Sequence, residues 1–154
     1  MKTYLYFAYG MNTNLAQMAM RCPQAQSLGA AYLPNHEFRF ARHADILHTP
    51  GYTTHGVLWE ITDACLKSLD ALEGYPDYYQ RKTVTVIHQG QQVECMTYYM
   101  TGNLPDEAPG TGYVAMLEEG YRENGVPDRQ IYDALDFVEA YHTALAKKGQ
   151  HVYG

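Results

Sequence analysis

Residues 3–12 read TYLYFAYGMN, an aromatic-rich run that ends in a glycine turn. Neither face of residues 3–9 is polar, which predicts a strand buried on both sides near the centre of its sheet. Gly10 ends this strand, and the NTN at 12–14 predicts the N-cap of a short helix. A strand that opens through glycine towards a helix exposes several backbone N–H groups, which suits a carboxylate or a developing oxyanion. The alternative interpretation is a plain structural turn.

Outward from this strand, the pattern predicts further strands and a second helix. We expect two strands over residues 25–34 and 36–43, separated by a Pro-Asn pair. HTPGYTTHG at 48–56 predicts a loop. GVLWEI at 56–61 then predicts a strand that leads into a helix, with Thr62 as its N-cap.

The second half of the chain predicts a β-hairpin and a long loop. RKTVTVIH at 81–88 and VECMTYYM at 93–100 have strand composition and flank a turn around residues 89–91. Residues 101–112 predict a loop that is long enough to suggest a functional role.

Two helices are expected to close the chain. The first runs over about residues 113–124 and stops at Gly125, and the second starts after Pro127-Asp128. One apolar stripe of the second helix is formed by Ile131, Leu135, Val138, His142 and Leu145.

The order of these elements predicts the fold class. Strands dominate the first two-thirds of the chain, and helices are inserted singly and gather at the end. We therefore expect an α+β fold, a small mixed β-barrel or strongly curved sheet with flanking helices. The length of 154 residues predicts a single domain over 1–154.

Composition and charge exclude several classes of partner. The net charge is −6 and no basic stripe is present, so we expect no nucleic-acid partner. No apolar run is long enough for a membrane span, and the N-terminus lacks the apolar core of a signal peptide. Cys22, Cys65 and Cys95 are widely spaced, which indicates free thiols, two of them in the core, and a cytoplasmic location. A homodimer is left open, because nothing in the sequence fixes the oligomeric state.

The common catalytic motifs are missing from the sequence. No HxH or HExxH is present, and His36 and His43 lie on opposite faces of a strand, so we expect no metal site. The only serines, Ser27 and Ser68, lie outside any GxSxG turn. The chain also has neither a P-loop nor a dinucleotide fingerprint.

SLDALEGYPDYY at 68–79 contains a carboxylate where a core residue is expected. Leu66, Leu69 and Glu73 fall on one helical stripe, and Gly74 follows as a helix-terminating glycine. One interpretation is a frayed last residue that reaches solvent past Gly74. The other is a semi-buried carboxylate whose pKa is raised by desolvation towards neutrality, which suits proton transfer. Three downstream tyrosines could wall such a site, namely Tyr75, Tyr78 and Tyr79.

Three segments, in order along the chain, resemble the γ-glutamylcyclotransferase family. FAYGMN at 7–12 resembles the FAYGSN signature of that family. GVLWEI and the later LDALEGYPDYYQRKTVTV resemble its next block of strand, helix, catalytic glutamate and strand. The segment from Tyr113 to ENGVP resembles its closing segment, and the resemblance covers about residues 3–132.

The resemblance implies a small β-barrel with helices around it, no cofactor, and a small-molecule γ-glutamyl substrate that is converted to 5-oxoproline. Glu73 matches the acid–base glutamate of the family, Tyr79 matches an aromatic hydroxyl near it, and Tyr113 matches a binding tyrosine. The substrate-binding loop of the family matches Tyr6, Phe7, Ala8, Tyr9, Gly10, Met11 and Asn12. Met11 stands where the signature has serine, so a hydroxyl contact is lost while a backbone N–H contact is kept.

Two hypotheses follow for the function. In the first, the protein is an enzyme that cyclises a γ-glutamyl amino acid or amine, using the α-amine of the substrate as nucleophile. This agrees with the lack of a serine or cysteine nucleophile motif. In the second, the protein is a non-catalytic binding module for glutamate-like small molecules, which Met11 supports and Glu73 opposes. In the first hypothesis the loop 101–112 is expected to cover the pocket.

Overall fold

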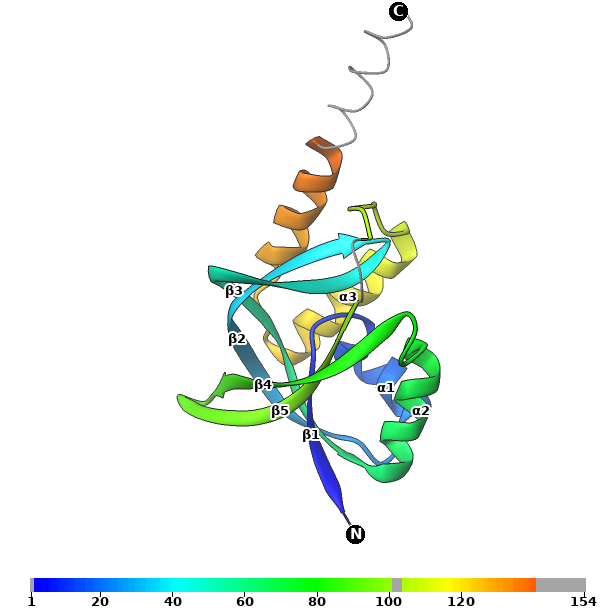
Figure 1. The fold of residues 1–154 in the computed structure, drawn as a ribbon. Helices are drawn as coiled ribbons and strands as arrows, with labels where there is room; N and C mark the ends of the chain where they lie inside the picture. The colour runs from blue at the N-terminus through cyan, green and yellow to red at the C-terminus, as the bar shows by residue number, and fades with distance from the viewer. Residues whose placement is uncertain (1, 101–103, 141–154) are drawn as a thin grey trace, which may run out of the picture.

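The computed structural model describes residues 2–100 and 104–140, which form a closed β-barrel with helices outside it (Figure 1). The elements are β1 (Thr3–Ala8), the 3₁₀ turn η1 (Met11–Thr13), α1 (Leu15–Arg21), β2 (Gln26–Ala41), β3 (His43–Thr62), α2 (Asp63–Glu73), β4 (Tyr79–His88), β5 (Gln91–Met100) and α3 (Thr111–Asn124). Residues 129–140 form a further helix. The expected α+β fold with a small barrel is confirmed.

The strand order around the barrel is β1-β3-β2-β4-β5. Neighbouring strands are antiparallel, except that β1 and β5 close the barrel in parallel through Tyr6 and Met96. The sheet is therefore mixed, as expected. β1 lies between β3 and β5, and Phe7 and Ala8 in it are buried, which confirms the central strand expected from its apolar faces.

The β2–β3 hairpin is more continuous than expected. The two strands expected over 25–34 and 36–43 form one strand, β2, because β3 pairs with both parts. A register shift falls between Pro34 and His36, and a proline is tolerated at such an irregularity because its missing N–H is not needed there. The loop expected at 48–56 was wrong for the same reason, since these residues belong to β3 and pair with β2.

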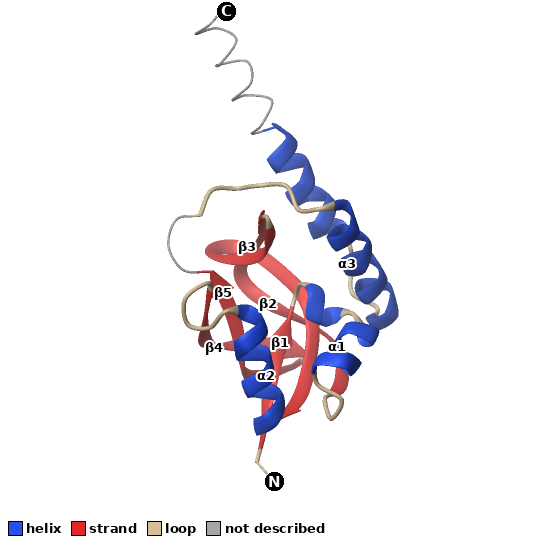
Figure 2. Cartoon of the chain, turned by 90° about the vertical axis from the view of Figure 1, so that its right-hand side faces the viewer, coloured by secondary structure: helices blue, strands red, loops and turns tan. Residues whose placement is uncertain are grey.

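Helix ends follow the local sequence closely. Asn14 caps α1 and Thr62 caps α2, each through a side-chain oxygen that accepts a backbone N–H. α2 and α3 both end at a glycine in the left-handed conformation, Gly74 and Gly125. The helices lie outside the barrel, where α1 packs beside α2, and α3 packs on η1 (Figure 2).

The helix over 129–140 is fixed to β3. The side chain of Gln130 accepts from the backbone N–H of His55 and donates to its carbonyl, at 2.7 and 2.8 Å. Its expected stripe is buried at Ile131 and Val138 and partly buried at Leu135, whereas His142 and Leu145 lie outside the described residues. The three cysteines are free, as expected, and Cys22 is buried in addition to Cys65 and Cys95, for which burial was expected. No helix within residues 2–100 and 104–140 is long and apolar enough to cross a membrane.

Candidate active site

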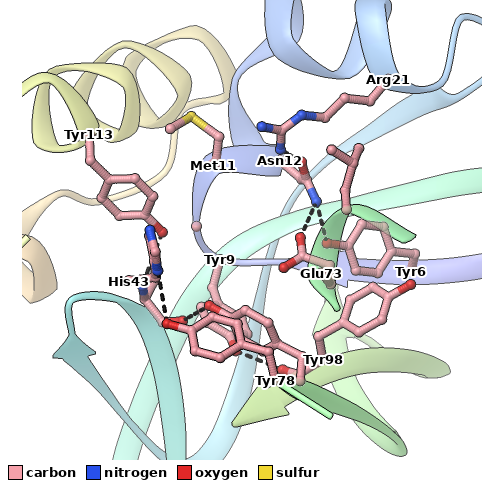
Figure 3. A pocket seen from close by; sticks show the side chains of 14 residues that line it. Tyr6, Tyr9, Met11, Asn12, Arg21, His43, Glu73, Tyr78, Tyr98 and Tyr113 are labelled. Carbon is pink, nitrogen blue, oxygen red and sulfur yellow. Dashed lines mark hydrogen bonds between the residues drawn. The ribbon is translucent and has the colours of Figure 1, made fainter. Parts of the chain in front are cut away.

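A cavity of about 220 Å³ opens where β1 ends. It lies between the η1 turn, the C-terminal end of α2 and the tip of the β2–β3 hairpin (Figure 3). The residues expected at the site that line the cavity are Tyr6, Tyr9, Gly10, Met11, Asn12, Glu73, Tyr79 and Tyr113. Phe7 and Ala8 do not line it, because Phe7 is buried against Gly56 and Ala8 pairs with Val57 in the barrel wall.

Glu73 is the last residue of α2, four residues after the fully buried Leu69. Its carboxylate faces the cavity (Figure 3), and the residue is partly buried. Burial raises the pKa of Glu73 from 4.5 to about 7, partly opposed by the charge of Arg21 and a hydrogen bond from Asn12. The interpretation of Glu73 as a frayed, solvated residue was therefore wrong. A carboxyl with such a pKa is suited to exchange a proton near neutral pH.

Asn12 connects the glycine turn to this carboxylate. Its side-chain Nδ2 donates to Oε1 of Glu73 and to the hydroxyl of Tyr6, both at 3.0 Å. Its Oδ1 accepts from Nη1 of Arg21 at 2.5 Å. Asn12 is buried, the bond to Tyr6 is buried as well, and the bonds with Glu73 and Arg21 are partly buried, so competition from water is reduced. The turn and the carboxylate therefore belong to one hydrogen-bonded unit.

The glycine turn itself is closely packed. The carbonyl of Gly10 accepts from the backbone N–H and the hydroxyl of Thr13, at 3.0 and 2.8 Å. A Cβ on Gly10 would lie 3.1 Å from both the Cβ of Ala44 and the hydroxyl of Tyr113, so a larger residue would displace the cavity wall. The first N–H groups of a helical turn have no partner within that turn. Those at Met11 and Asn12 are thus suited to bind an anionic oxygen.

Two tyrosines expected at the site hold Ala44 between them. The hydroxyl of Tyr79 donates to the carbonyl of Ala44 at 2.6 Å, and the hydroxyl of Tyr113 accepts from its N–H at 3.0 Å. Burial raises the pKa of both hydroxyls above the ordinary value, so both stay protonated near neutral pH. Because Tyr113 accepts at this bond, its own proton is available to another partner.

The wall opposite Glu73 is aromatic. His43, at the start of β3, makes a 2.9 Å hydrogen bond to the hydroxyl of Tyr78 and stacks edge-on against Tyr113. Burial and the nearby Arg42 lower the pKa of His43 below its ordinary value. This imidazole is therefore mostly neutral at pH 7.

The described part of the loop that was expected to cover the pocket lies away from the cavity. Residues 104–110 do not line the cavity, and Glu107 instead forms backbone hydrogen bonds with Phe40 and Arg42 at the hairpin tip. The first residues of that loop, 101–103, lie outside the described residues. Over the described ranges, no three His, Cys, Asp or Glu side chains are grouped so that they could hold a metal ion.

Several lining residues were not expected from the sequence, and these are Arg21, His43, Ala44, Leu72 and Tyr98. Tyr78 had been expected as a wall of the site and does line it, whereas Tyr75 packs against Arg81 instead. Leu72 adjoins Glu73 and could have been found from that neighbourhood. The other unexpected residues come from α1, the hairpin tip and β5, and no local signal marks them.

Solved structures and curated proteins resemble this chain over most of its length. A structure named gamma-glutamyl cyclotransferase superposes with a TM-score of 0.78 at 29% identity, covering 85% of this chain and 86% of that one. The human gamma-glutamylcyclotransferase is 29% identical over 140 residues, covering 82% of this chain and 74% of the human protein. A putative gamma-glutamylcyclotransferase from Drosophila melanogaster is 37% identical over 99 residues, covering 60% of this chain and 62% of its own.

A family model confirms the resemblance seen in the sequence motifs. The model described as gamma-glutamyl cyclotransferase, AIG2-like, matches residues 6–123. The chain belongs to the γ-glutamyl cyclotransferase, AIG2-like family.

Proposed function

We propose that the protein is a γ-glutamylcyclotransferase that converts a γ-glutamyl amino acid or amine into 5-oxoproline and releases the free amino acid or amine. The observation that carries this proposal is the desolvated carboxylate of Glu73, which has a pKa of about 7. It lines the same cavity as the glycine turn at Gly10. The similarity to proteins named gamma-glutamylcyclotransferase supports the same reaction.

The nucleophile of this reaction is part of the substrate. The α-ammonium group of the γ-glutamyl unit loses a proton, and the nitrogen lone pair attacks the γ-carbonyl carbon of the same molecule. A five-membered ring closes and the carbonyl electrons move onto oxygen. The tetrahedral intermediate then collapses, the γ-amide C–N bond breaks, and the leaving nitrogen gains a proton. Overall the α-nitrogen gives up two protons, and the amine gains two when it leaves as an ammonium ion.

Glu73 is assigned the proton transfers. A carboxyl with a pKa of about 7 is ionised in a large fraction of molecules at neutral pH, so it can accept a proton from the α-ammonium. Once protonated, it can return that proton to the leaving nitrogen. One carboxyl therefore serves as base and then as acid, and the protein needs no second catalytic group for the protons.

The turn and the aromatic wall are assigned to binding. Backbone N–H groups at Met11 and Asn12 would hold the γ-glutamyl end or the developing oxyanion, and the hydroxyl proton of Tyr113 is a further donor. Binding of the substrate in a folded conformation brings its amine and its γ-carbonyl within reach of each other. This removes a large part of the free-energy barrier to ring closure. Free buried thiols agree with a reducing compartment, and we place this activity in the cytoplasm.

A second candidate function is a binding module that holds glutamate-like ligands without turnover. Met11 favours it, because a methionine side chain cannot make the contact of a serine hydroxyl. The raised pKa of Glu73 opposes it, because a binding site for an ammonium group gains from a carboxylate that is always ionised.

A panel of substrates separates the two candidates. Purified protein is incubated with γ-glutamyl-alanine, γ-glutamyl-phenylalanine, γ-glutamyl-ε-lysine and γ-glutamyl-putrescine, and 5-oxoproline is measured by mass spectrometry. The matched control is the α-glutamyl isomer of each compound, which has the same atoms but carries its amide on the α-carbonyl, so that ring closure at the γ-carbon cannot release the amine or free 5-oxoproline. We expect 5-oxoproline from at least one γ-linked compound and none from the α-linked ones. Binding of the panel in calorimetry without product would establish the binding module instead.

A further inference from the structure

We propose that Arg21 is a positioning residue of this site: through the side chain of Asn12 it fixes the hydrogen-bond donor of Glu73, and it supplies a positive charge that acts on that carboxylate. The inference rests on the proposed function for its effect on turnover. Its physical part concerns three side chains of the substrate-free protein and can be measured without turnover.

The chemistry of the three side chains fixes the orientation of the amide. A guanidinium has only donors, so Arg21 can bond only to the oxygen of the Asn12 amide, and the 2.5 Å contact is to Oδ1. The NH₂ group must then point the other way, where it reaches Glu73 and Tyr6 at 3.0 Å each. Without Arg21, a flipped amide would place its oxygen against the carboxylate, and two acceptors would face each other.

The positions of Arg21 and Glu73 are set by two helices that contact each other, α1 and α2. Arg21 is the last residue of α1, and Glu73 is the last residue of α2. The hydroxyl of Ser68, in α2, donates to the backbone carbonyl of Arg21 at 3.1 Å, which fixes the end of α1 against α2. The guanidinium is thus presented to Asn12 from a defined backbone position.

Apart from Arg21, the titratable groups that line the cavity around Glu73 carry no charge near neutral pH. Burial raises the pKa of each lining tyrosine above the ordinary value, and the charge of Glu73 adds to this for all six, namely Tyr6, Tyr9, Tyr78, Tyr79, Tyr98 and Tyr113. His43, across the cavity, has a lowered pKa. Asp70, on the same helix, is engaged by the hydroxyl of Tyr98 and by Arg81. Among the described groups that line the cavity, Arg21 is therefore the permanent cation.

Two opposing effects set the proton affinity of Glu73. Desolvation is the larger and raises its pKa, and the charge of Arg21 opposes it, with a net value of about 7. Removal of the charge leaves desolvation less opposed. The pKa of Glu73 should then rise by about one, which is a tenfold change in proton affinity and the lower end of the range for one nearby opposite charge.

Three substitutions separate the charge of Arg21 from its hydrogen bond. Arg21→Met removes both, Arg21→Gln keeps a donor without the charge, and Arg21→Lys keeps a donor and the charge. The matched control is Arg129→Met, because Arg129 is an exposed arginine on the helix over 129–140, far along the chain from the site. Thermal unfolding establishes that each variant is folded.

The first measurement is the pKa of Glu73 by carbon-13 NMR of the side-chain carboxyls in the substrate-free protein, with Glu73→Gln to identify the signal. We expect Arg21→Met and Arg21→Gln to raise it by about one, and Arg21→Lys and Arg129→Met to change it by only a few tenths. A folded Arg21→Met or Arg21→Gln with an unchanged pKa overturns the proposal. So does Arg21→Lys with as large a rise as Arg21→Gln. This readout stays valid if the substrate panel yields no product.

The second measurement is the pH dependence of kcat/KM on the best substrate of the panel. The ionised form of Glu73 is the base, so a higher pKa moves the acid limb of the profile to higher pH by the same amount. Arg21→Gln should show this displacement while it keeps the high-pH plateau. Arg21→Met should also lower the plateau, by about tenfold, because the amide is no longer held. Equal plateaus for these two variants would overturn the orientation part of the proposal.

Discussion

The C-terminal ends of α2 and α3 are built alike. Each helix stops at a glycine in the left-handed conformation, Gly74 at φ 65° and Gly125 at φ 67°. Each glycine follows a polar residue, Glu73 in α2 and Asn124 in α3. Both polar side chains reach the same short segment, because Glu73 contacts Asn12 while Asn124 donates to the carbonyl of Thr13 at 2.8 Å.

The two ends differ in how far their polar groups are satisfied. Nδ2 of Asn124 donates to two backbone carbonyls, those of Thr13 and Gly120, and its Oδ1 accepts from Ser27. Glu73 has one amide donor, Asn12, at a cavity and a pKa of about 7. The comparison teaches that one local motif can anchor a turn or present a carboxyl with a raised pKa to a cavity. The surroundings decide which, because they determine whether the group is saturated or desolvated.

The largest expected difference between the two ends is in activity. Glu73→Gln should lower kcat/KM by about a thousandfold or more, because it removes the only group assigned to both proton transfers. Asn124→Ala should lower it less than tenfold but should reduce the free energy of unfolding by about 1–2 kcal/mol, because the carbonyl of buried Thr13 loses a donor. Steady-state kinetics and urea unfolding on both variants make the comparison. Full activity in a folded Glu73→Gln would end the assignment of Glu73.

The second expected difference is in the pH dependence of stability. The pKa of Glu73 is about 7 in the folded protein and about 4.5 unfolded, so between these values the folded state binds more protons. Stability therefore falls as the pH rises through this window, by roughly 3 kcal/mol at most. Urea unfolding of the wild type relative to Glu73→Gln should show this loss between about pH 4.5 and pH 7. Groups common to both proteins cancel in the difference, and a flat difference would mean that Glu73 is not desolvated.

The smallest expected difference concerns the two glycines themselves. Alanine in the left-handed conformation costs about 1 kcal/mol, which is the effect expected for Gly125→Ala, because nothing lies within 4 Å of an added Cβ. Gly74→Ala should cost about 1 kcal/mol more, because its Cβ would lie 3.0 Å from the Cβ of Tyr78. Since Tyr78 lines the cavity, only Gly74→Ala should also raise KM. Thermal unfolding and steady-state kinetics on both variants test this. Equal losses of stability and an unchanged KM in both would show that Tyr78 moves aside without cost.

Local sequence was enough where the stabilising contacts are local. Helix caps at Asn14 and Thr62, both helix-ending glycines and the β4–β5 hairpin are formed by residues a few positions apart, and all were expected. The interruption expected near Pro34 and the loop expected at 48–56 were wrong, because pairing between β2 and β3 overrides the local turn signals.

The site divides in the same way. The position of Glu73 on an apolar stripe and the glycine turn before Asn12 were visible in the sequence, because helical spacing and a chain break are local patterns. Arg21, His43 and Tyr98 were not, because each comes from a different element and reaches the cavity only when the barrel closes.

The sequence by itself determined the α+β class, most helix limits, and an acidic residue on an apolar helical stripe, Glu73. These depend on periodicity, capping and turn residues, which act over a few positions. Only the tertiary structure decided how dry that carboxyl is, which amide and guanidinium it faces, and which aromatic side chains close the cavity around it. A proton affinity depends on solvent exclusion and on charges from every neighbouring element, and these neighbours are set by folding rather than by distance along the chain.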